Sequence, residues 1–235
     1  MTATSTFWRL AGKVPRVQRV ELLDVPELDV RYVNVPKTGT GTVRMQVYRQ
    51  LCDAAGRDLP RSILWERTRW VRIGRLGDLE PRFTFAFCRD PYARLASVYR
   101  HKIVKPRSEG RRVSPLFVLY GRRFRLDMTF PDFVRAVAAV PDDRAEKHFR
   151  SQTRSLHHEG VLVVDYLGRV ERFAETWAEV VTRSRLEPLR RGYNRTAEDT
   201  PFELGDWYDT ELLSIVNERY REDFELLGYP QLTSV

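Results

Sequence analysis

The chain has 235 residues, of which 42% are hydrophobic, so it can bury a core of ordinary size, and global disorder is excluded. Its net charge of +8 favours anionic ligands, and nucleotides, nucleic acids, acidic glycans and membrane surfaces all suit that charge. No segment reaches the roughly 20 apolar residues of a membrane span, and Cys52 and Cys88 lie in apolar surroundings typical of core residues. We therefore expect one soluble, cytoplasmic domain over residues 1–235, which begins with an irregular lead-in over residues 1–28.

The first ordered unit is predicted to be a strand, a loop and a helix. Arg31–Val35 is a short β-rich run that ends at Pro36. After a loop rich in glycine and threonine, apolar residues recur every four positions, which is typical of one helix face. These residues are Val43, Val47 and Leu51.

A second unit follows the same order. Phe83–Cys88 (FTFAFC) is an apolar run typical of a buried strand, and Pro91 favours a helix start, so we expect a helix from there to about His101. Strands that alternate with helices predict an α/β fold in which a parallel sheet is covered on both faces and binds ligands at the carboxyl ends of its strands. The later predicted elements are a buried strand at 161–165 (VLVVD) and helices at 131–139, 144–156, 171–183 and 206–227.

The loop over residues 36–42, PKTGTGT, is suited to an anion. A loop that leaves a strand and opens a helix directs free backbone N–H groups and the positive end of the helix dipole at one point. Two glycines allow close approach of the backbone, three threonine hydroxyls add donors, and one lysine adds a full charge. The lysine precedes the glycines, so this is not a Walker loop, and an ordinary glycine-rich turn is the alternative. The residues expected to hold the anion are Lys37, Thr38, Gly39, Thr40, Gly41 and Thr42.

A second basic segment, CRDPYARLASVY, follows the second strand. Arg89 comes directly after Cys88, so its guanidinium is expected at the end of the strand, where it can bind a phosphate in a bidentate way. Ser97 lies about two helical turns further on and can add a hydroxyl. The alternative is that Arg89 and Asp90 simply pair at a helix start.

Together these two stretches resemble the carbohydrate sulfotransferases, in particular the chondroitin 4-O- and HNK-1-type enzymes of the sulfotransferase superfamily. PKTGTGT looks like the family's 5′-phosphosulfate loop, and RDPYARLASVY looks like its 3′-phosphate segment. Weaker similarity continues in the same order through FPDFVRAV, residues 148–152, VDYLGRVERF and ERYREDFELLGY. Gly41 departs from the pattern, because the family usually has threonine or serine there. The Golgi-resident relatives carry an N-terminal anchor, which we do not expect in this chain, so the resemblance favours a soluble, bacterial-type enzyme.

The resemblance implies a P-loop-like three-layer α/β/α fold and 3′-phosphoadenosine-5′-phosphosulfate (PAPS) as the donor of a sulfuryl group. Lys37 would stabilise the leaving phosphate, and Arg89 and Ser97 would hold the 3′-phosphate. The acceptor would be a hydroxyl of a glycan, a glycoconjugate or another hydroxylated molecule. No metal ion and no nucleic acid partner is implied.

A histidine is suited to activate the acceptor hydroxyl, because its unperturbed pKa lies near neutrality. His148 is the first candidate, because it falls in the block that resembles the family's histidine-bearing helix, with Gln152 one turn on; a partly exposed structural histidine is the alternative. His101 is expected to orient the cofactor or the acceptor. The turn GYNRT, residues 192–196, resembles a loop that closes over the nucleotide, so Asn194 and Arg195 are further candidates, although a capping turn also fits.

The basic segment over residues 100–125 is predicted to be either a solvated loop or an acceptor wall in which Phe117, Tyr120 and Phe124 stack on sugars.

Two rival functions stay open. A nucleotide kinase would need a magnesium-binding carboxylate after a strand, and Asp165 is the obvious candidate. A nucleic-acid-binding protein would use the basic charge alone, without a recognised motif.

Overall fold

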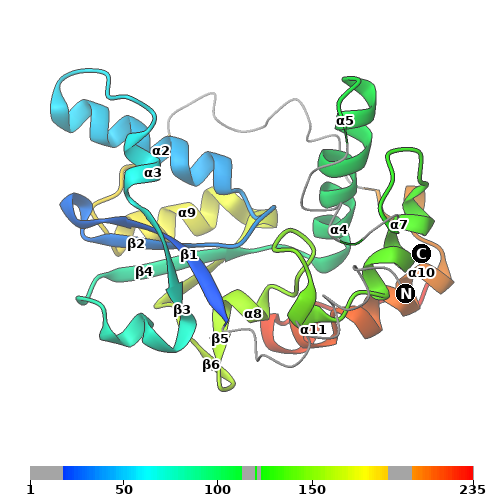
Figure 1. Cartoon of the computed structure of the whole chain (residues 1–235). Helices are drawn as coiled ribbons and strands as arrows, with labels where there is room; N and C mark the ends of the chain where they lie inside the picture. The colour runs from blue at the N-terminus through cyan, green and yellow to red at the C-terminus, as the bar shows by residue number, and fades with distance from the viewer. Residues whose placement is uncertain (1–17, 113–119, 121–122, 190–202, 235) are drawn as a thin grey trace, which may run out of the picture.

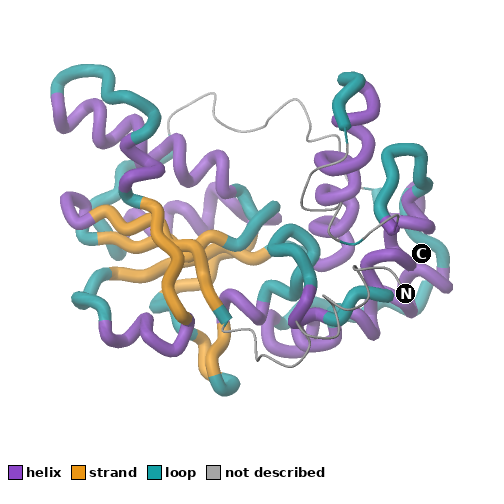
Figure 2. Tube along the Cα trace, viewed as in Figure 1, coloured by secondary structure: helices purple, strands orange, loops and turns teal. Residues whose placement is uncertain are grey.

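A five-stranded sheet forms the centre of the computed structural model, which describes residues 18–112, 120, 123–189 and 203–234 (Figure 1). Figure 2 shows helices on both sides of this sheet. The α/β class expected from the sequence is therefore confirmed. The strands lie in the order β3–β1–β2–β4–β7, with bounds Thr68–Arg72, Arg19–Val25, Val30–Asn34, Phe83–Cys88 and Tyr166–Arg169.

Three neighbouring strands, β2, β4 and β7, run parallel. Val33 lies opposite Ala86, which in turn lies opposite Leu167. β1 is antiparallel to both β2 and β3. For the pair of β1 and β2 this follows from the short turn over Pro26–Leu28 that joins them, because a short turn can connect only antiparallel neighbours. The sheet is therefore mixed, and the expected parallel arrangement holds for β2, β4 and β7.

The strand β1 corrects the expectation of an irregular lead-in over residues 1–28. Six of the seven residues of Arg19–Val25 are buried, since β1 lies inside the sheet with a neighbour on each side. Prolines disrupt a strand when they stand inside it. Pro15 and Pro26 stand before and after Arg19–Val25 in the sequence, so neither prevents this strand from forming. Residues 1–17 lie outside the described residues, and the prediction of one domain over the whole chain stays a prediction.

The side chains of β4 alternate between two hydrophobic clusters, one on each face of the sheet. Phe85 and Phe87 pack with helices α2 (Thr40–Ala55) and α9 (Phe173–Thr182), and Ala86 belongs to the cluster on the opposite face. This alternation is what a strand covered on both faces requires. The helices on the second face are α4 (Pro91–Tyr99), α7 (Phe130–Ala138), α8 (Thr153–Leu156), α10 (Thr210–Arg219) and α11 (Arg221–Leu227).

The expected buried strand at 161–165 is wrong. Val161–Leu162 is β6 of a small two-stranded ribbon with β5 (His157–His158), and Val161 is 67% exposed. Glu159 and Gly160 take left-handed φ values of 52° and 80°, as a two-residue hairpin turn requires. The strand that enters the main sheet is β7, which begins directly after Asp165.

Two helix predictions also need correction. Over residues 144–156 the structure has a short 3₁₀ turn followed by loop, and only α8 at its end is α-helical, because side-chain contacts hold most of this segment in place. The helix expected over residues 206–227 is divided into α10 and α11 at Tyr220, whose ψ of 27° departs from helical geometry. The helices predicted at 131–139 and 171–183 agree with α7 and α9 within a few residues.

Helix α4 continues past its expected end. A π-helical turn over Arg100–Val104 leads into α5 (Lys105–Ser108), and together they form one rod beside the sheet (Figure 1). Single π turns occur often at functional sites, and this one carries His101. Within the described residues, no helix is both long and apolar enough to cross a membrane.

Candidate active site

The PKTGTGT loop joins the end of β2 to the start of α2, as the sequence predicts. Lys37 and Gly39 have left-handed φ values of 72° and 80°. A Cβ atom added to Gly39 would lie 3.0 Å from the ring of Phe173 in α9, so both space and backbone favour glycine there. Helix α2 begins without a side-chain cap, whereas Asp90, Thr129 and Asp209 cap α4, α7 and α10. The first N–H groups of α2 therefore suit an anion.

The threonine hydroxyls of this loop act differently from expectation. The Thr38 hydroxyl donates to the Val35 carbonyl oxygen over 2.7 Å, and the Thr40 hydroxyl donates to Asn34 Oδ1 over 2.6 Å. Each hydroxyl has one proton, so these two fasten the loop, and the residues offer their backbone N–H groups to an anion instead. Thr42, in contrast, is partly exposed in the first turn of α2.

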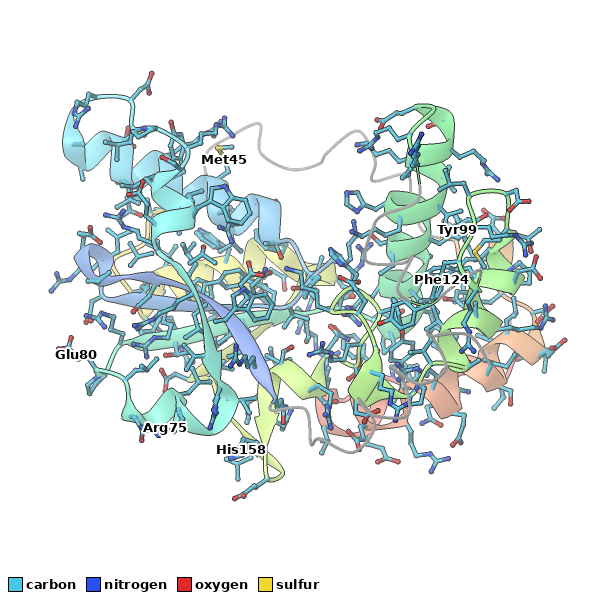
Figure 3. The ribbon with its side chains drawn as sticks, viewed as in Figure 1. Met45, Arg75, Glu80, Tyr99, Phe124 and His158 are labelled. Carbon is cyan, nitrogen blue, oxygen red and sulfur yellow. The ribbon has the colours of Figure 1, made fainter. Side chains whose placement is uncertain are left out.

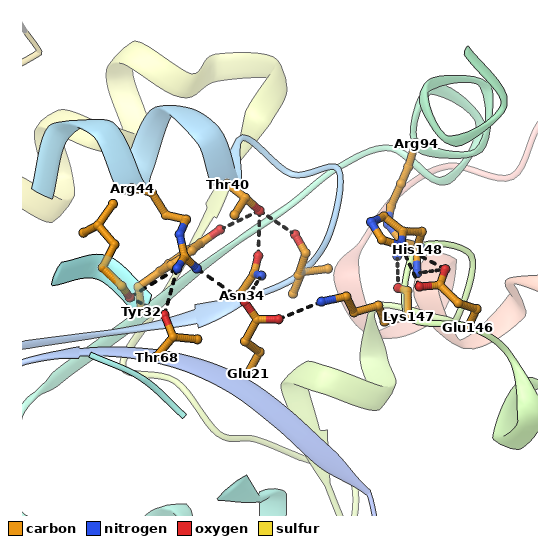
Figure 4. A network of polar contacts seen from close by, with 12 residues as sticks. Glu21, Tyr32, Asn34, Thr40, Arg44, Thr68, Arg94, Glu146, Lys147 and His148 are labelled. Carbon is orange, nitrogen blue, oxygen red and sulfur yellow. Dashed lines mark hydrogen bonds and ion pairs between the residues drawn. The ribbon is translucent and has the colours of Figure 1, made fainter. Parts of the chain in front are cut away.

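A buried carboxylate, Glu21 on β1, supports the loop from below (Figure 4). Its Oε1 accepts from Asn34 Nδ2 over 2.9 Å and pairs with Arg44 of α2 over 3.3 Å, and its Oε2 accepts from Lys147 Nζ over 2.8 Å. Burial alone would raise the pKa of Glu21, but the hydrogen bond and charge of Lys147, with Asn34 and Arg44, lower it overall. Glu21 therefore stays ionised and links the loop to the segment that carries His148.

Arg89 is held at the carboxyl end of β4 by a buried glutamine. Its N–H group donates to Gln152 Oε1 over 2.9 Å, and Gln152 Nε2 donates to the Arg89 carbonyl oxygen over 2.8 Å. The N–H group of Gln152 donates in turn to Asp223 of α11 over 2.9 Å, and both Gln152 and Asp223 are fully buried. Glu171 accepts from the next N–H group, that of Asp90, over 2.6 Å. The backbone on both sides of the Arg89 side chain is thus fixed.

Ser97, the second residue expected at the 3′-phosphate, is partly exposed, whereas every other residue of α4 is buried. It therefore lies on the one face of α4 that a ligand can reach. The adjacent π turn also brings His101 towards His148, with ring centroids 6.5 Å apart.

Arg94 of α4 joins the loop, the helix and the His148 segment. It is 2% exposed, and its Nε donates to the Pro36 carbonyl oxygen over 3.1 Å. Nη1 donates to the Arg150 carbonyl oxygen over 2.8 Å, and Nη2 donates to that of Lys147 over 3.4 Å. Residues 147–150, which lie 53 to 56 positions beyond Arg94 in the sequence, are therefore placed against α4 and the loop, and His148 stands between the two carbonyl groups that Arg94 binds there.

His148 is oriented by Glu146. Its Nδ1 lies 2.7 Å from Glu146 Oε1, and since an ionised carboxylate only accepts, Nδ1 carries the proton and Nε2 keeps a lone pair. Burial lowers the pKa of His148 below its usual value, although Glu146 opposes this shift. Burial would raise the pKa of Glu146, but the hydrogen bond to His148 lowers it overall. A neutral imidazole held by an ionised carboxylate is the arrangement of a general base with its orienting group.

The model of the sulfotransferase family matches residues 21–230. The chain belongs to the sulfotransferase family. It is 28% identical over 173 residues to carbohydrate sulfotransferase 14 of Mus musculus and equally to that of Homo sapiens, and these alignments cover 65% of this chain. They cover 43% of each relative, so the chain spans less than half the length of these curated relatives. No solved structure matches the chain significantly. The resemblance inferred from PKTGTGT and RDPYARLASVY is confirmed.

Several residues singled out in the sequence lie elsewhere in this sulfotransferase-family fold. Phe124 is 3% exposed and packs in the helical part of the molecule (Figure 3), with its ring 5.8 Å from that of Phe133, so it is a core residue and not an acceptor wall. Tyr120 donates its hydroxyl proton to the Arg144 carbonyl oxygen. Phe117, and the candidates Asn194 and Arg195, lie outside the described residues.

Asp165, the candidate magnesium ligand of the kinase alternative, lies at the wrong end of the sheet. It precedes β7 and accepts from the Thr84 N–H group over 2.7 Å, near the amino end of β4, whereas the PKTGTGT loop follows the carboxyl end of β2. In the described part of the chain, no group of three or more acidic, histidine or cysteine side chains is placed to hold a metal ion. The kinase alternative therefore has no support.

Sequence reasoning assigned no role to three residues that shape the site: Arg94, Glu146 and Glu21. Arg94 had one visible signal, because it is a charged residue within a helix whose other positions are nearly all apolar or aromatic. Glu146 stands two residues before His148, but the helix expected there would have directed the two side chains to different faces. Glu21 lay in the segment expected to be irregular.

Proposed function

We propose that this chain is a PAPS-dependent sulfotransferase that acts on a hydroxyl of a carbohydrate. The observation that carries the proposal is the meeting of the PKTGTGT loop and the segment that begins at Arg89 at the carboxyl ends of the parallel neighbours β2 and β4, joined by the hydrogen bond from Arg94 to Pro36. A nucleotide with phosphates at both its 5′ and 3′ positions fits this pair of segments. Membership of the sulfotransferase family, and the name carbohydrate sulfotransferase 14 of the relatives, support the same choice.

The residues present fit the donor. The N–H groups at the start of α2 would hold the 5′-phosphate, and the left-handed backbone at Gly39 permits its close approach. Arg89, fixed by Gln152, would form a charge-assisted fork with the 3′-phosphate, and Ser97 would add a hydroxyl. PAPS supplies the sulfuryl group that is transferred in line to the acceptor. Lys37 would stabilise the negative charge that develops on the departing phosphate.

His148 would take the proton of the acceptor hydroxyl at Nε2. Its lowered pKa keeps the imidazole neutral at pH 7, so the lone pair is available without prior deprotonation. Glu146 would hold the ring in place and stabilise the imidazolium that forms. The cytoplasmic location expected from the sequence stays a prediction.

Calorimetric titration with 3′-phosphoadenosine 5′-phosphate (PAP), the product nucleotide, tests this function. Wild type should bind PAP at least tenfold more tightly than 5′-AMP, because the contact with Arg89 requires the 3′-phosphate. Arg89→Ala should remove most of that preference, whereas Arg57→Ala, on the exposed surface beyond α2, should keep it. Lys37→Ala should lower the rate of sulfate transfer from labelled PAPS more than it lowers PAP affinity.

Equal binding of PAP and 5′-AMP by wild type would contradict the assignment of Arg89. Salt-sensitive binding to DNA or RNA without any response to PAP would favour the nucleic-acid alternative instead.

A further inference from the structure

Two exposed tryptophans flank the candidate active site. Trp65 in α3 (Ile63–Glu66) is 70% exposed, and Trp70 in the edge strand β3 is 51% exposed. The other large hydrophobic side chains with comparable exposure among the described residues are Val161, Leu162 and Leu226, which lie on the ribbon and on α11. Exposed indoles that gather on one flank indicate a binding surface more strongly than scattered apolar residues do.

Each indole is held by a cation that belongs to the polar network of the site. The Arg44 guanidinium lies 4.9 Å from the ring centroid of Trp65, and Lys147 Nζ lies 5.1 Å from that of Trp70. Both cations pair with the same carboxylate, Glu21. Trp70 is the cross-strand partner of Glu21, so the two side chains lie on one face of the sheet. These contacts fix the rings while most of their surface stays open.

The two indoles are connected through Arg44 and Lys147 to the residues of the candidate active site. Lys147 directly precedes His148, and Arg44 lies one turn beyond Thr40 of the phosphate loop on α2. Arg44 also donates to Thr68 Oγ1 on β3 over 2.8 Å, which ties the strand of Trp70 to the helix. We therefore expect a molecule bound at His148 to reach Trp70 where it extends past Lys147.

We propose that Trp65 and Trp70 form an acceptor subsite that stacks pyranose rings of an anionic glycan next to the sugar that reacts. This inference rests on the proposed function. The face of a pyranose ring with its axial hydrogens is apolar and flat, and it matches an exposed indole in size. Two cations share one buried carboxylate, so the subsite has a net positive charge, which the exposed pair Arg19 and Arg72 extends along β1 and β3.

The small size of this surface favours a glycan over a protein partner. A stable protein interface needs about 800 Å² from each partner, whereas here two side chains carry the apolar area. Aromatic rings with basic neighbours beside a base are what an extended, acidic sugar chain requires. Carboxylate or sulfate groups on neighbouring sugars would lie against Lys147 and Arg72.

Calorimetry with defined oligosaccharides tests the subsite at saturating PAP. The probes are a hyaluronan hexasaccharide, which alternates uronic acid and amino sugar, its disaccharide, and a neutral chitin hexasaccharide. Wild type should bind the hyaluronan hexasaccharide at least tenfold more tightly than either other probe. Trp65→Ala and Trp70→Ala should each weaken hexasaccharide binding about tenfold, and Trp70→Phe should recover part of the loss, because an aromatic face remains.

The controls separate this inference from the proposed function. PAP affinity should be unchanged in both tryptophan variants, and Leu226→Ala, an exposed apolar residue on α11, should change neither affinity. Three results would overturn the subsite: unchanged hexasaccharide affinity in both variants, equal affinity of wild type for the anionic and neutral probes, or no binding of any probe. If PAP still binds in these cases, the proposed function is unaffected. A wild-type dimer that the tryptophan variants convert to monomers in sedimentation would show that the surface pairs two copies, and would also overturn it.

Discussion

The Arg94 guanidinium lies with its Nε 3.1 Å from the carbonyl oxygen of Pro36, inside a region from which solvent is nearly excluded. Its hydrogen bonds from Nε, Nη1 and Nη2 all go to backbone carbonyl oxygens, not to a carboxylate. Burial lowers the pKa of Arg94, with the charges of Tyr220 and Asp223 opposing the shift, but an arginine stays protonated at any physiological pH. The cation therefore acts as a rigid connector that fixes the loop over residues 36–42 relative to His148.

Arg94→Lys should weaken this connection without removing the charge. A lysine ammonium has no planar fork and cannot reach three carbonyl groups at once. We expect a loss of about tenfold in PAP affinity together with a larger loss in transfer rate, because both the loop and His148 shift.

Arg94→Met should also lower the free energy of unfolding by about 3 kcal/mol, because buried carbonyl groups lose their donors. Calorimetry and urea unfolding measure these effects, and Arg57→Lys on the surface is the control. Wild-type kinetics in Arg94→Lys would show that the loop holds its place alone.

The sequence predicted those parts of the site that follow from local pattern. The loop over residues 36–42, the strand over residues 83–88 and the helix after it have apolar periods and turn residues that leave few alternatives, and the structure agrees there. Long-range contacts were not predictable. Gln152 is 63 residues from Arg89, and Lys147 is 126 residues from Glu21. Residues 144–152 look helical by composition, yet contacts with Asp142, Asp223 and Arg94 hold them in a series of turns and loop. Tertiary hydrogen bonds outweigh a weak local preference there.

The pH dependence of transfer should report the His148–Glu146 pair. Because burial lowers the pKa of His148, activity should rise with pH along a limb that lies below the usual histidine value of about 6.5. Glu146→Gln removes the charge that opposes this shift, so the limb should move to still lower pH. The rate on the plateau should fall about 10- to 100-fold, because the imidazolium loses its stabilising carboxylate. A pH–rate profile of kcat/KM for both proteins measures this.

His148→Ala completes this test. Transfer should fall at least 100-fold, since general base catalysis typically contributes that much, while PAP affinity stays within about twofold of wild type. A limb that moves to higher pH in Glu146→Gln, or a normal rate in His148→Ala, would remove the pair from the mechanism.

Gln152→Glu should disturb Arg89 without changing the size of the side chain. The new carboxylate would face the Arg89 carbonyl oxygen, and its position 3.3 Å from Asp223 would bring two acidic groups together. We expect PAP affinity at pH 7.5 to fall about tenfold and 5′-AMP affinity to fall less, because the 3′-phosphate contact is the one that is lost. At pH 5.5 part of the difference should be recovered, since a protonated glutamic acid can donate to the Arg89 carbonyl oxygen as the glutamine does.

The control for this change is Gln50→Glu on α2, which breaks a contact with the Arg185 carbonyl oxygen far from Arg89. It should leave both nucleotide affinities unchanged at both pH values. If PAP and 5′-AMP weaken equally in Gln152→Glu, the glutamine supports the whole fold and does not act through Arg89.

The two glycines of the phosphate loop should respond in opposite ways to the same substitution. Gly39→Ala places a Cβ at a φ of 80° and 3.0 Å from Phe173, which should cost about 1–2 kcal/mol and weaken PAP binding at least tenfold. Gly41 lies in the first turn of α2 with no atom within 4 Å of an added Cβ, so Gly41→Ala should raise the stability of the helix by about 0.5–1 kcal/mol and keep PAP affinity within about threefold. Thermal unfolding and PAP titration of both variants measure this contrast. If Gly41→Ala weakens PAP as strongly as Gly39→Ala does, the bound nucleotide occupies the space beside the Gly41 Cα, and the lack of a side chain is required at both glycines.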